Sequence, residues 1–416
     1  MRIIHFLENY ARVGGAEAYA HQVIGYLERV GHANIVVYAQ QHAPELQFQV
    51  GRTCHVPQPD YPRSVAGAAR HIADIVADER PDVAFVHHVY HPSVIDFVTQ
   101  QLPAIAYVQG PYVVCPGFRQ YLPREERACP HAAGLICLWN GLVKRCIWGR
   151  NPLTHLRFLR RTRDFLAVYQ RMHRVIVGST FMRDLLGRNG LPGEKVAISP
   201  TFLLEPGSSP SPAYRAVERP TILFSGRIVR EKGLHHLLLA LRDITVPWQL
   251  IVAGIGPDES RCQQLAYRYG IEGRVTFRGW VNSTELQKLI MGCDVAAAPS
   301  LWPEPFGRVG PEAFVHGKPV VAYASGGICD WLHDGVNGLV VPTADVQALR
   351  QALTALLSRP ALREKLGQQA YEQALLDYPI DKHLSVITST LKGAIQAHEP
   401  STASGHRGVE IGQNRH

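Results

Sequence analysis

Short apolar runs alternate with amphipathic stretches along the first half of the chain. Helical patterns separate five apolar runs that are short enough to be buried strands, at residues 3–6, 35–38, 83–87, 105–108 and 175–177. A glycine pair, Gly14-Gly15, leads from the first strand into the first helix. This alternation predicts a parallel, doubly wound sheet with helices on its faces.

The same rhythm restarts after a Pro-, Gly- and Ser-rich stretch at 205–220, which has the composition of a linker. Further strands are expected at 221–224, 249–252, 275–277, 295–298 and 320–322. The pattern predicts two Rossmann-like domains, 1–204 and 221–375, that face each other across a ligand-binding cleft. A helix near 380–396 is expected to join the first domain, and residues 398–416 to be disordered.

Composition excludes several classes of protein. Hydrophobic residues make up 46% of the 416 residues and charged residues 19%, which is ordinary for a folded globular protein. No apolar run approaches the roughly 18 residues of a membrane span, and no signal peptide is evident, so a cytoplasmic protein is expected. Eight cysteines are too few for a disulfide scaffold.

The net charge of +8 is concentrated in one segment. Residues 144–174 hold nine basic residues and one acid, Asp164, and the rest of the chain is neutral in sum. A local basic patch is therefore indicated, and a nucleic-acid-binding surface is not.

The first strand of the second half ends at a candidate phosphate site. Gly226-Arg227 and Lys232 stand between that strand and a leucine-rich helix. Two cations near a helix start suit a phosphate, since Arg227 offers a bidentate fork and Lys232 a point charge. Solvated charges on an ordinary loop remain the alternative.

Two glutamates flank a proline- and glycine-rich loop further on. Glu304 lies in the loop, and Glu312 lies in the first turn of the next helix. The N–H groups of residues 306–309 are expected to be free to meet a phosphate. Glu312 is placed to accept hydrogen bonds from vicinal hydroxyls, as acidic residues do for a ribose. The alternative makes Glu312 a partner of the helix dipole and Glu304 a solvated charge.

These residues resemble glycosyltransferase family 4. The resemblance is carried by Gly14-Gly15-Ala16-Glu17, Gly226-Arg227, Lys232-Gly233, the run 300–307, Glu312-Ala313, 317–320 and Gly326-Gly327, and it covers about residues 3–390. It implies a retaining enzyme of the GT-B fold that takes its sugar from a nucleoside diphosphate donor. Transfer to a glycan or lipid-linked acceptor, in cell-surface polysaccharide or glycolipid synthesis, is expected.

The resemblance also implies roles for single residues. Arg227 and Lys232 would bind the diphosphate beside Gly226, with Gly14 and Gly15 closing over it, and Glu312 would bind the ribose. Glu304 would face the hexose, with backbone donors around it at Phe306, Gly307, Arg308 and Val309. Fixed cations would stabilise the charge of the leaving diphosphate, so no cofactor and no divalent metal is expected.

One position departs from the family pattern. Family members with a Cys-Pro at this place carry His-Asp shortly before it, and this chain has Gln109-Gly110. Glutamine keeps a hydrogen-bond donor and an acceptor but cannot become cationic. Gln109 is expected to inherit a positional role toward the donor sugar. The alternative is a catalytically silent relative that binds the donor or scaffolds an assembly.

The first domain holds two further features. Cys115, Cys129, Cys137 and Cys146 lack the short spacing of common zinc sites, so buried free thiols are the favoured interpretation and a zinc-stapled loop the alternative. A helix over 152–172 would gather basic residues on one face, namely Arg157, Arg160, Arg161 and Arg171. One hypothesis is that the segment Lys144–Arg174 docks on an anionic inner membrane surface or binds a lipid-diphosphate acceptor. The other is a solvated face.

Overall fold

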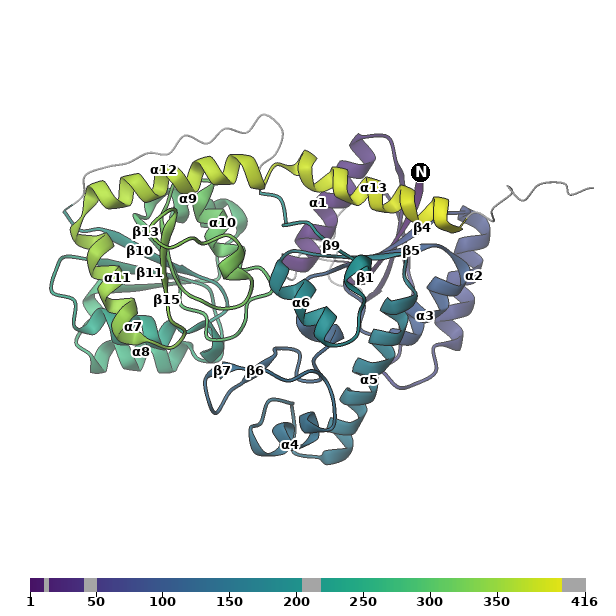
Figure 1. The fold of residues 1–416 in the computed structure, drawn as a ribbon, viewed down its shortest axis with the longest axis horizontal. Coiled ribbons are helices and arrows are strands. Elements are labelled where there is room, and N and C mark those ends of the chain that lie inside the picture. The colour runs from purple at the N-terminus through teal and green to yellow at the C-terminus, as the bar shows by residue number, and fades with distance from the viewer. Residues whose placement is uncertain (11–14, 41–50, 204–217, 399–416) are drawn as a thin grey trace, which may run out of the picture.

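Two parallel β-sheets, each with helices packed against it, form the two halves of the protein in a computed structural model (Figure 1). The structure describes residues 1–10, 15–40, 51–203 and 218–398. The predicted linker at 205–220 and the predicted tail at 398–416 lie almost entirely outside these residues, as does Gly14.

The N-terminal sheet has seven strands in the order β3-β2-β1-β4-β5-β8-β9. Every neighbouring pair is parallel, and the central strands are buried on both faces. The strands are β1 (Arg2–Asn9), β2 (Ala33–Gln40), β3 (Arg52–His55), β4 (Val83–Val86), β5 (Ala104–Val108), β8 (Arg174–Val177) and β9 (Val196–Ile198).

The C-terminal sheet has six parallel strands in the order β12-β11-β10-β13-β14-β15. They are β10 (Thr221–Ser225), β11 (Gln249–Ala253), β12 (Val275–Gly279), β13 (Val295–Ala298), β14 (Val320–Tyr323) and β15 (Gly338–Val341). In both sheets the strand order reverses at the first strand of the half, and ligands of such sheets bind at that point.

Helices connect the strands of each sheet, and α11 and α12 follow the last strand. They are α1 (Gly15–Arg29), α2 (Ala66–Glu79), α3 (Pro92–Gln101), α5 (Pro152–Arg171) and α6 (Thr180–Arg188) in the N-terminal half, and α7 (Leu234–Arg242), α8 (Glu259–Arg268), α9 (Ser283–Gly292), α10 (Val309–Phe314), α11 (Val346–Ser358) and α12 (Pro360–Asp377) in the C-terminal half. Polar caps define several starts. Asn151 accepts a hydrogen bond from the Leu153 N–H at α5, and Ser179 from Met182 at α6.

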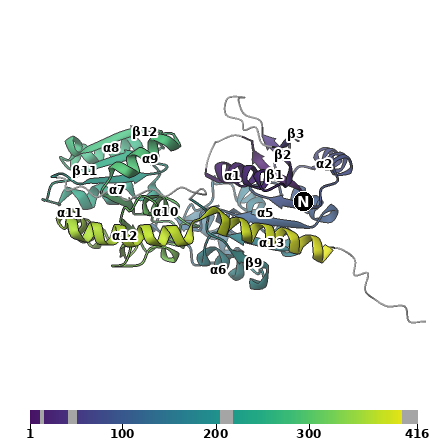
Figure 2. The same ribbon diagram turned by 90° about the horizontal axis from the view of Figure 1, so that it is seen from above.

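The last helix, α13 (Ile380–His398), returns to the N-terminal half. Ile380, Leu384, Ile387 and Leu391 are buried in one apolar cluster with Ile3, Val83 and Ile105 of the N-terminal strands. Figure 2 shows α12 and α13 following one another along the length of the molecule. The C-terminal end of the chain therefore completes the core that the N-terminal strands begin.

Residues 115–150 form an excursion between β5 and α5, which we call the cysteine loop. It holds a short hairpin, β6 (Tyr121–Leu122) with β7 (Arg127–Ala128), and one helix, α4 (Ile136–Val143). In Figure 1 the loop lies below the two sheets, with α4 beside the start of α5.

Candidate active site between the two domains

A cavity of about 440 Å³ lies between the two halves. Its walls come from the carboxyl ends of parallel strands, where β5 leads to Gln109, β8 to Gly178, β10 to Gly226 and β13 to Ser300. It therefore occupies the position predicted for the ligand cleft. Among the predicted site residues, those that line it are Gly15, Gln109, Gly226, Lys232, Glu304, Phe306, Gly307, Arg308 and Val309.

Lys232 and Glu304 form an ion pair within this cavity. Lys232 Nζ lies 2.7 Å from Glu304 Oε1, and the Ser300 hydroxyl donates to the same oxygen at 2.5 Å. Glu304 is 5% exposed, so its charge is largely removed from water and depends on these two donors. Within the described chain, no hydrogen bond reaches Oε2 of Glu304, which leaves that oxygen able to accept one from a ligand.

Backbone geometry fixes Lys232 at the end of a 3₁₀ turn, η4 (Arg230–Lys232). The next residue, Gly233, has φ +73°, and a Cβ there would lie 1.9 Å from the carbonyl oxygen of Pro299. Only glycine fits, because it has no Cβ and adopts positive φ without strain. This close contact holds the turn Arg230–Lys232 against the segment that contains Ser300 and Glu304.

The loop between Glu304 and α10 packs against the side chain of Trp331. The indole N–H donates to the Phe306 carbonyl at 2.6 Å, and a Cβ on Gly310 would meet the Trp331 ring at 1.9 Å. The described residues offer no acceptor to the N–H groups of Gly307, Arg308 and Val309. Three oriented donors therefore remain available at the cavity wall.

Arg308 is the second cation of the cavity wall. Its Nε donates to Glu312 at 3.2 Å, and Nη1 lies 3.5 Å from the Thr201 hydroxyl of the other domain. Glu312 and Arg227 are not among the residues that line the cavity: Glu312 is half-buried next to Arg308, and Arg227 is exposed. The structure thus assembles Lys232 and Arg308 in the cavity, whereas the sequence pointed to Lys232 and Arg227.

Gln109 lies on the opposite wall, one residue after the end of β5. Its side-chain nitrogen is buried, and it has no hydrogen-bond partner among the described residues. A buried amide without a partner is costly in a folded protein, so a ligand that accepts this hydrogen bond would gain affinity. The position of Gln109 is compatible with the predicted role toward a sugar.

Direct contacts join the two walls beside the cavity. The Ser179 hydroxyl donates to the Pro305 carbonyl, and the Thr180 hydroxyl donates to Asp330 at 2.7 Å. A Cβ on Gly327 would meet the Pro305 carbonyl oxygen at 2.6 Å and Ser179 Cβ at 2.9 Å. The domains therefore touch at the start of α6, next to the loop that carries Glu304.

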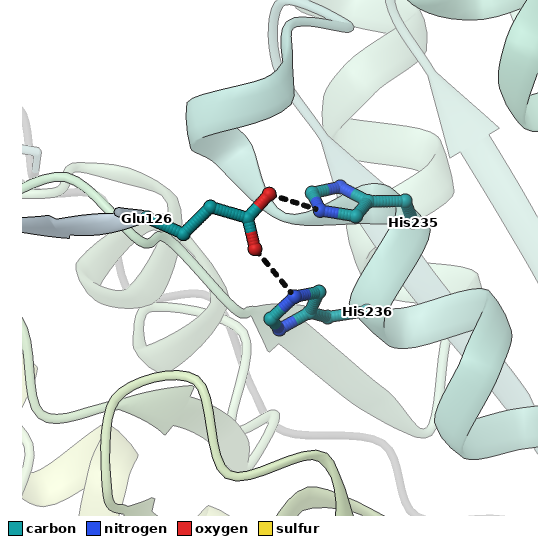
Figure 3. Close-up of side chains that lie close together, drawn as sticks. All are labelled: Glu126, His235 and His236. Carbon is teal, nitrogen blue, oxygen red and sulfur yellow. Dashed lines mark ion pairs between the residues drawn. The ribbon is translucent and has the colours of Figure 1, made fainter. Parts of the chain in front are cut away.

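A second interdomain contact centres on Glu126 at the tip of the β6–β7 hairpin (Figure 3). Its carboxylate lies 2.6 Å from Arg230 Nη2, 3.4 Å from His235 Nε2 and 3.3 Å from His236 Nε2. Burial lowers the pKa of His235 to about 4 and also lowers the pKa of His236, so both rings are neutral near pH 7. Arg230 is therefore the positive charge that balances Glu126. Burial alone would raise the pKa of the Glu126 carboxyl, but the hydrogen bond and charge of Arg230 outweigh burial, and the pKa is lowered.

Comparison with known proteins identifies the family. The family model described as Glycosyltransferase Family 4 matches residues 13–203, and the one described as Glycosyl transferases group 1 matches residues 212–373. The chain belongs to glycosyltransferase family 4. Family 4 was the expectation from the motifs, and it is confirmed.

Individual relatives match parts of this family 4 chain. An uncharacterized glycosyltransferase, YqgM of Bacillus subtilis, is 33% identical over 252 residues, which is 59% of this chain and 65% of that protein. A phosphatidyl-myo-inositol mannosyltransferase of Mycobacterium leprae is 32% identical over 210 residues, 48% of this chain and 55% of that protein. The chain spans about half the length of the curated relatives that it matches.

Solved structures confirm the GT-B fold of this family 4 member. HepE of Anabaena, in complex with UDP, superposes with a TM-score of 0.69 over 94% of this chain and 99% of that one, at 16% sequence identity. At that identity the likeness concerns the fold alone.

Helix α5 corrects one part of the sequence interpretation. Arg161 was assigned to a solvent-facing basic face, but it is 8% exposed. Its guanidinium lies over the rings of Phe118, Phe165 and Tyr90, and Nε donates to the Tyr90 carbonyl. Arg171 pairs with Asp96. The other three predicted cations, Arg157, Arg160 and Arg171, are exposed as expected, and the further exposed cations of this region are Arg145, Arg150, Arg163 and Arg174.

In the same stretch of chain, a set of exposed apolar side chains lies on or beside α4, between α4 and α5, and at the start of α5, and we call this set the apolar face. Trp148 is 77% exposed, Leu153 73%, Leu135 72% and Trp139 61%. The other members are Ile136, Leu142, Val143 and Leu156. Across the described residues, no helix has both the length and the apolar character needed to cross a membrane.

Proposed function

We propose that this protein transfers a sugar, with retention of configuration, from a nucleoside diphosphate sugar to a glycan or lipid-linked acceptor. The observation that carries the proposal is the cavity between the domains, which combines Lys232, Arg308, three free backbone N–H groups and the half-satisfied carboxylate of Glu304. HepE, which shares the fold, has been solved with UDP and with UDP-glucose.

Each group has a role in this reaction. Charge develops on the diphosphate as the glycosidic bond breaks, and Lys232, Arg308 and the N–H groups of 307–309 stabilise it. Glu304 accepts a hydrogen bond from a sugar hydroxyl through Oε2. Gln109 donates to the sugar from the opposite wall, Glu312 binds the ribose hydroxyls, and Arg227 with Gly226 closes on the phosphates when the donor binds.

The same donor set favours a mechanism without a divalent metal at the diphosphate. Among the described residues that line the cavity, Glu304 is the only carboxylate, and Lys232 already neutralises it. Divalent cations of phosphate sites are held by carboxylates that remain charged. Lys232 and Arg308 supply the positive charge that such an ion would bring.

Replacing Gln109 with alanine tests this proposal. The wild type should turn over a nucleotide-sugar donor, at least by slow hydrolysis, and Gln109→Ala should lower kcat by about 10–100-fold, because one hydrogen bond to the sugar is lost. A donor screen by thermal shift, followed by release of nucleoside diphosphate, gives the measurement. Gln100→Ala, on α3 and outside the cavity, is the control.

The same assay separates the enzyme from the silent relative. Donor binding without turnover by the wild type, with activity gained in the double variant Gln109→His and Gly110→Asp, would identify a protein that has lost its chemistry. Activity that does not change in Gln109→Ala would remove this residue from the site.

We propose also that the apolar face and its cations hold the protein against an anionic membrane, where a lipid-linked acceptor lies. Tryptophan and leucine enter the interface, and arginines bind acidic headgroups. A second cavity, of about 360 Å³, reaches from Glu8 and Tyr61 to Arg157 and Thr154 at the start of α5. It offers a place for a polar acceptor headgroup near that membrane.

Liposome co-sedimentation tests the membrane contact. Binding to vesicles that contain phosphatidylglycerol should exceed binding to neutral vesicles and should weaken with salt. Each of Arg157→Ala and Arg160→Ala should lower the partition coefficient about fivefold, since one cation near an anionic surface contributes about 1 kcal/mol.

Tryptophan variants distinguish membrane binding through the apolar face from nonspecific adsorption to vesicles. Trp148→Ala should reduce binding, whereas Trp280→Ala should not, because Trp280 is 70% exposed but lies in the C-terminal domain. Binding that ignores both the anionic lipid and the salt would contradict the proposal.

A further inference from the structure

A pair of buried histidines stands in the first turn of α7. His235 is 8% exposed and His236 is 9% exposed. Neither ring nitrogen of His235 makes a hydrogen bond within the described part of the chain. A buried polar group without a partner destabilises a folded protein, and native proteins contain few of them. His235 therefore has the environment of a side chain that a bound ligand completes.

The two rings and one carboxylate converge on a single point (Figure 3). Glu126 Oε1 lies 3.4 Å from His235 Nε2, and Oε2 lies 3.3 Å from His236 Nε2. One ligand atom from each of the three residues lies within 4.8 Å of the other two. Elsewhere among the described residues, no three His, Cys, Asp or Glu side chains meet this condition, and the thiols of the cysteine loop do not.

The two distances suit a shared metal ion better than hydrogen bonds. A nitrogen that donates to a carboxylate as a charged pair usually lies about 2.7–2.9 Å from the oxygen. The distances at Glu126 are 3.3 and 3.4 Å. Zinc bonds of about 2.0–2.1 Å in a tetrahedron place neighbouring ligand atoms about 3.3–3.4 Å apart. The spacing of these three side chains is therefore that of ligands of one ion.

Two of the three side chains have a further contact that fixes them. His236 Nδ1 lies 3.0 Å from the hydroxyl of Tyr323, which is fully buried. When Nδ1 donates to this hydroxyl, the Nε2 lone pair faces the carboxylate, and a cation between these two acceptors makes the arrangement favourable. Arg230 donates to Glu126 Oε1, with Nε at 2.7 Å and Nη2 at 2.6 Å. Metal-binding histidines and carboxylates usually have outer contacts of this kind.

We propose that Glu126 Oε2, His235 Nε2 and His236 Nε2 bind one Zn²⁺ ion, with a water molecule as the fourth ligand. Imidazole and carboxylate bind the ion through existing lone pairs, so the step needs no oxidant or reductant. These three side chains are not among the residues that line the donor cavity. The inference is independent of the proposed transfer reaction.

The ion would join the two halves of the protein beside the cleft. Glu126 lies at the tip of the β6–β7 hairpin in the cysteine loop, which belongs to the N-terminal half. His235 lies in the C-terminal half, three residues after Lys232. Zinc bound here holds the hairpin against the start of α7, next to the turn Arg230–Lys232.

Arg230 opposes the ion as well as orienting the carboxylate. Its guanidinium carries a positive charge next to Oε1, but 49% of its side chain is exposed, so water screens the repulsion. Arg230→Gln should therefore raise the zinc affinity about tenfold. Glu126→Gln should lower it by at least about 100-fold, because a ligand is lost. An ion pair that binds no metal predicts neither change.

Titration calorimetry with Zn²⁺ tests the site. The full-length protein, without a histidine tag and stripped of metal by a chelator, should bind one ion per chain. His236→Gln should weaken binding as Glu126→Gln does. Glu125→Gln should leave it unchanged, because Glu125, on the same hairpin, pairs with Arg127 and Lys144 instead.

Two results would overturn the proposal. One is a wild-type protein that binds no zinc. The other is zinc binding that Glu126→Gln and His236→Gln retain, including the case in which Cys137→Ser loses it and the ion belongs to the cysteines. Circular dichroism of each variant shows whether a loss of binding reflects a loss of fold.

Cobalt provides a test that does not depend on variants. Wild-type protein loaded with Co²⁺ should show the visible absorption of tetrahedral cobalt with nitrogen and oxygen ligands. The weak absorption of octahedral cobalt, or the strong near-ultraviolet absorption of cobalt bound to thiolates, would contradict a site made by Glu126 and the two histidines.

Discussion

Replacing Lys232 with alanine is expected to lower kcat by about 10²–10³, because this lysine supplies charge to the departing diphosphate within a partly buried site. The variant also leaves Glu304, only 5% exposed, without its ionic partner. Donor affinity should fall less than kcat, since the negative charge on the diphosphate is greatest in the transition state. Steady-state kinetics over a range of donor concentrations separates the two effects.

Two comparisons sharpen this result. Lys288→Ala changes an exposed lysine on α9 of the same domain and should leave turnover unchanged. The double variant Lys232→Ala with Glu304→Gln should be more stable than Lys232→Ala alone, because no unpaired buried charge remains. Near-normal turnover in Lys232→Ala would exclude this residue from the reaction.

Replacing Trp331 with alanine is expected to lower the free energy of unfolding of the C-terminal domain by about 3–5 kcal/mol, the usual cost of removing a buried large aromatic side chain. Trp331 is 1% exposed and packs against Phe314, with a ring-centroid distance of 5.4 Å. The loop from Glu304 to Gly310 rests on this ring, so donor binding should be lost together with stability. Unfolding in guanidinium chloride, followed by far-ultraviolet circular dichroism, measures the free energy of unfolding.

Trp331→Phe separates packing from hydrogen bonding. Phenylalanine keeps most of the apolar contact but leaves the Phe306 carbonyl without its donor, at a cost of about 1–3 kcal/mol. A larger effect on donor affinity than on unfolding would show that the indole N–H orients the loop. Trp280→Ala, which removes an exposed tryptophan, should change stability by less than about 0.5 kcal/mol.

The buried strands could be predicted from the sequence because each is a short apolar run. β1, β4, β5 and β10 are nearly all buried, and all four were placed correctly. β3 was missed because it lies at an edge of the N-terminal sheet, is partly exposed and contains polar residues. β9 and β15, which also lie at sheet edges, are apolar but only three and four residues long, so their pattern is too short to stand out.

Cavity residues that belong to a recognisable loop motif could be predicted from the sequence. Residues that only the folded structure brings together could be predicted less well. Lys232 and Glu304 are 72 positions apart, and only the fold brings them to 2.7 Å. Arg308 was singled out for its backbone, whereas its side chain also lines the cavity. Thr201 and Tyr107 line it as well, and neither stands in a motif that would have revealed it.

Arg161 shows a limit of helical periodicity. Steps of 100° place it near Arg157 and Arg160, but α5 packs against α3 and α4, and side chains from loops cover the helix at Arg161 as well. Tyr90 and Phe118 come from segments that periodicity does not consider, and they enclose this guanidinium. A planar, weakly hydrated cation tolerates such an aromatic enclosure.

The return of α13 to the N-terminal half means that the chain passes twice between the domains. It leaves the first domain near Leu203 and comes back at Tyr378, and the Leu203 N–H donates to the Tyr378 carbonyl at 3.0 Å, so the two crossings are joined at this point. We expect two crossings tied together in this way to favour a rotation that opens and shuts the cleft over sliding of one domain along the other. Such a rotation would bring Lys232 and Gln109, on opposite walls, toward a bound donor together.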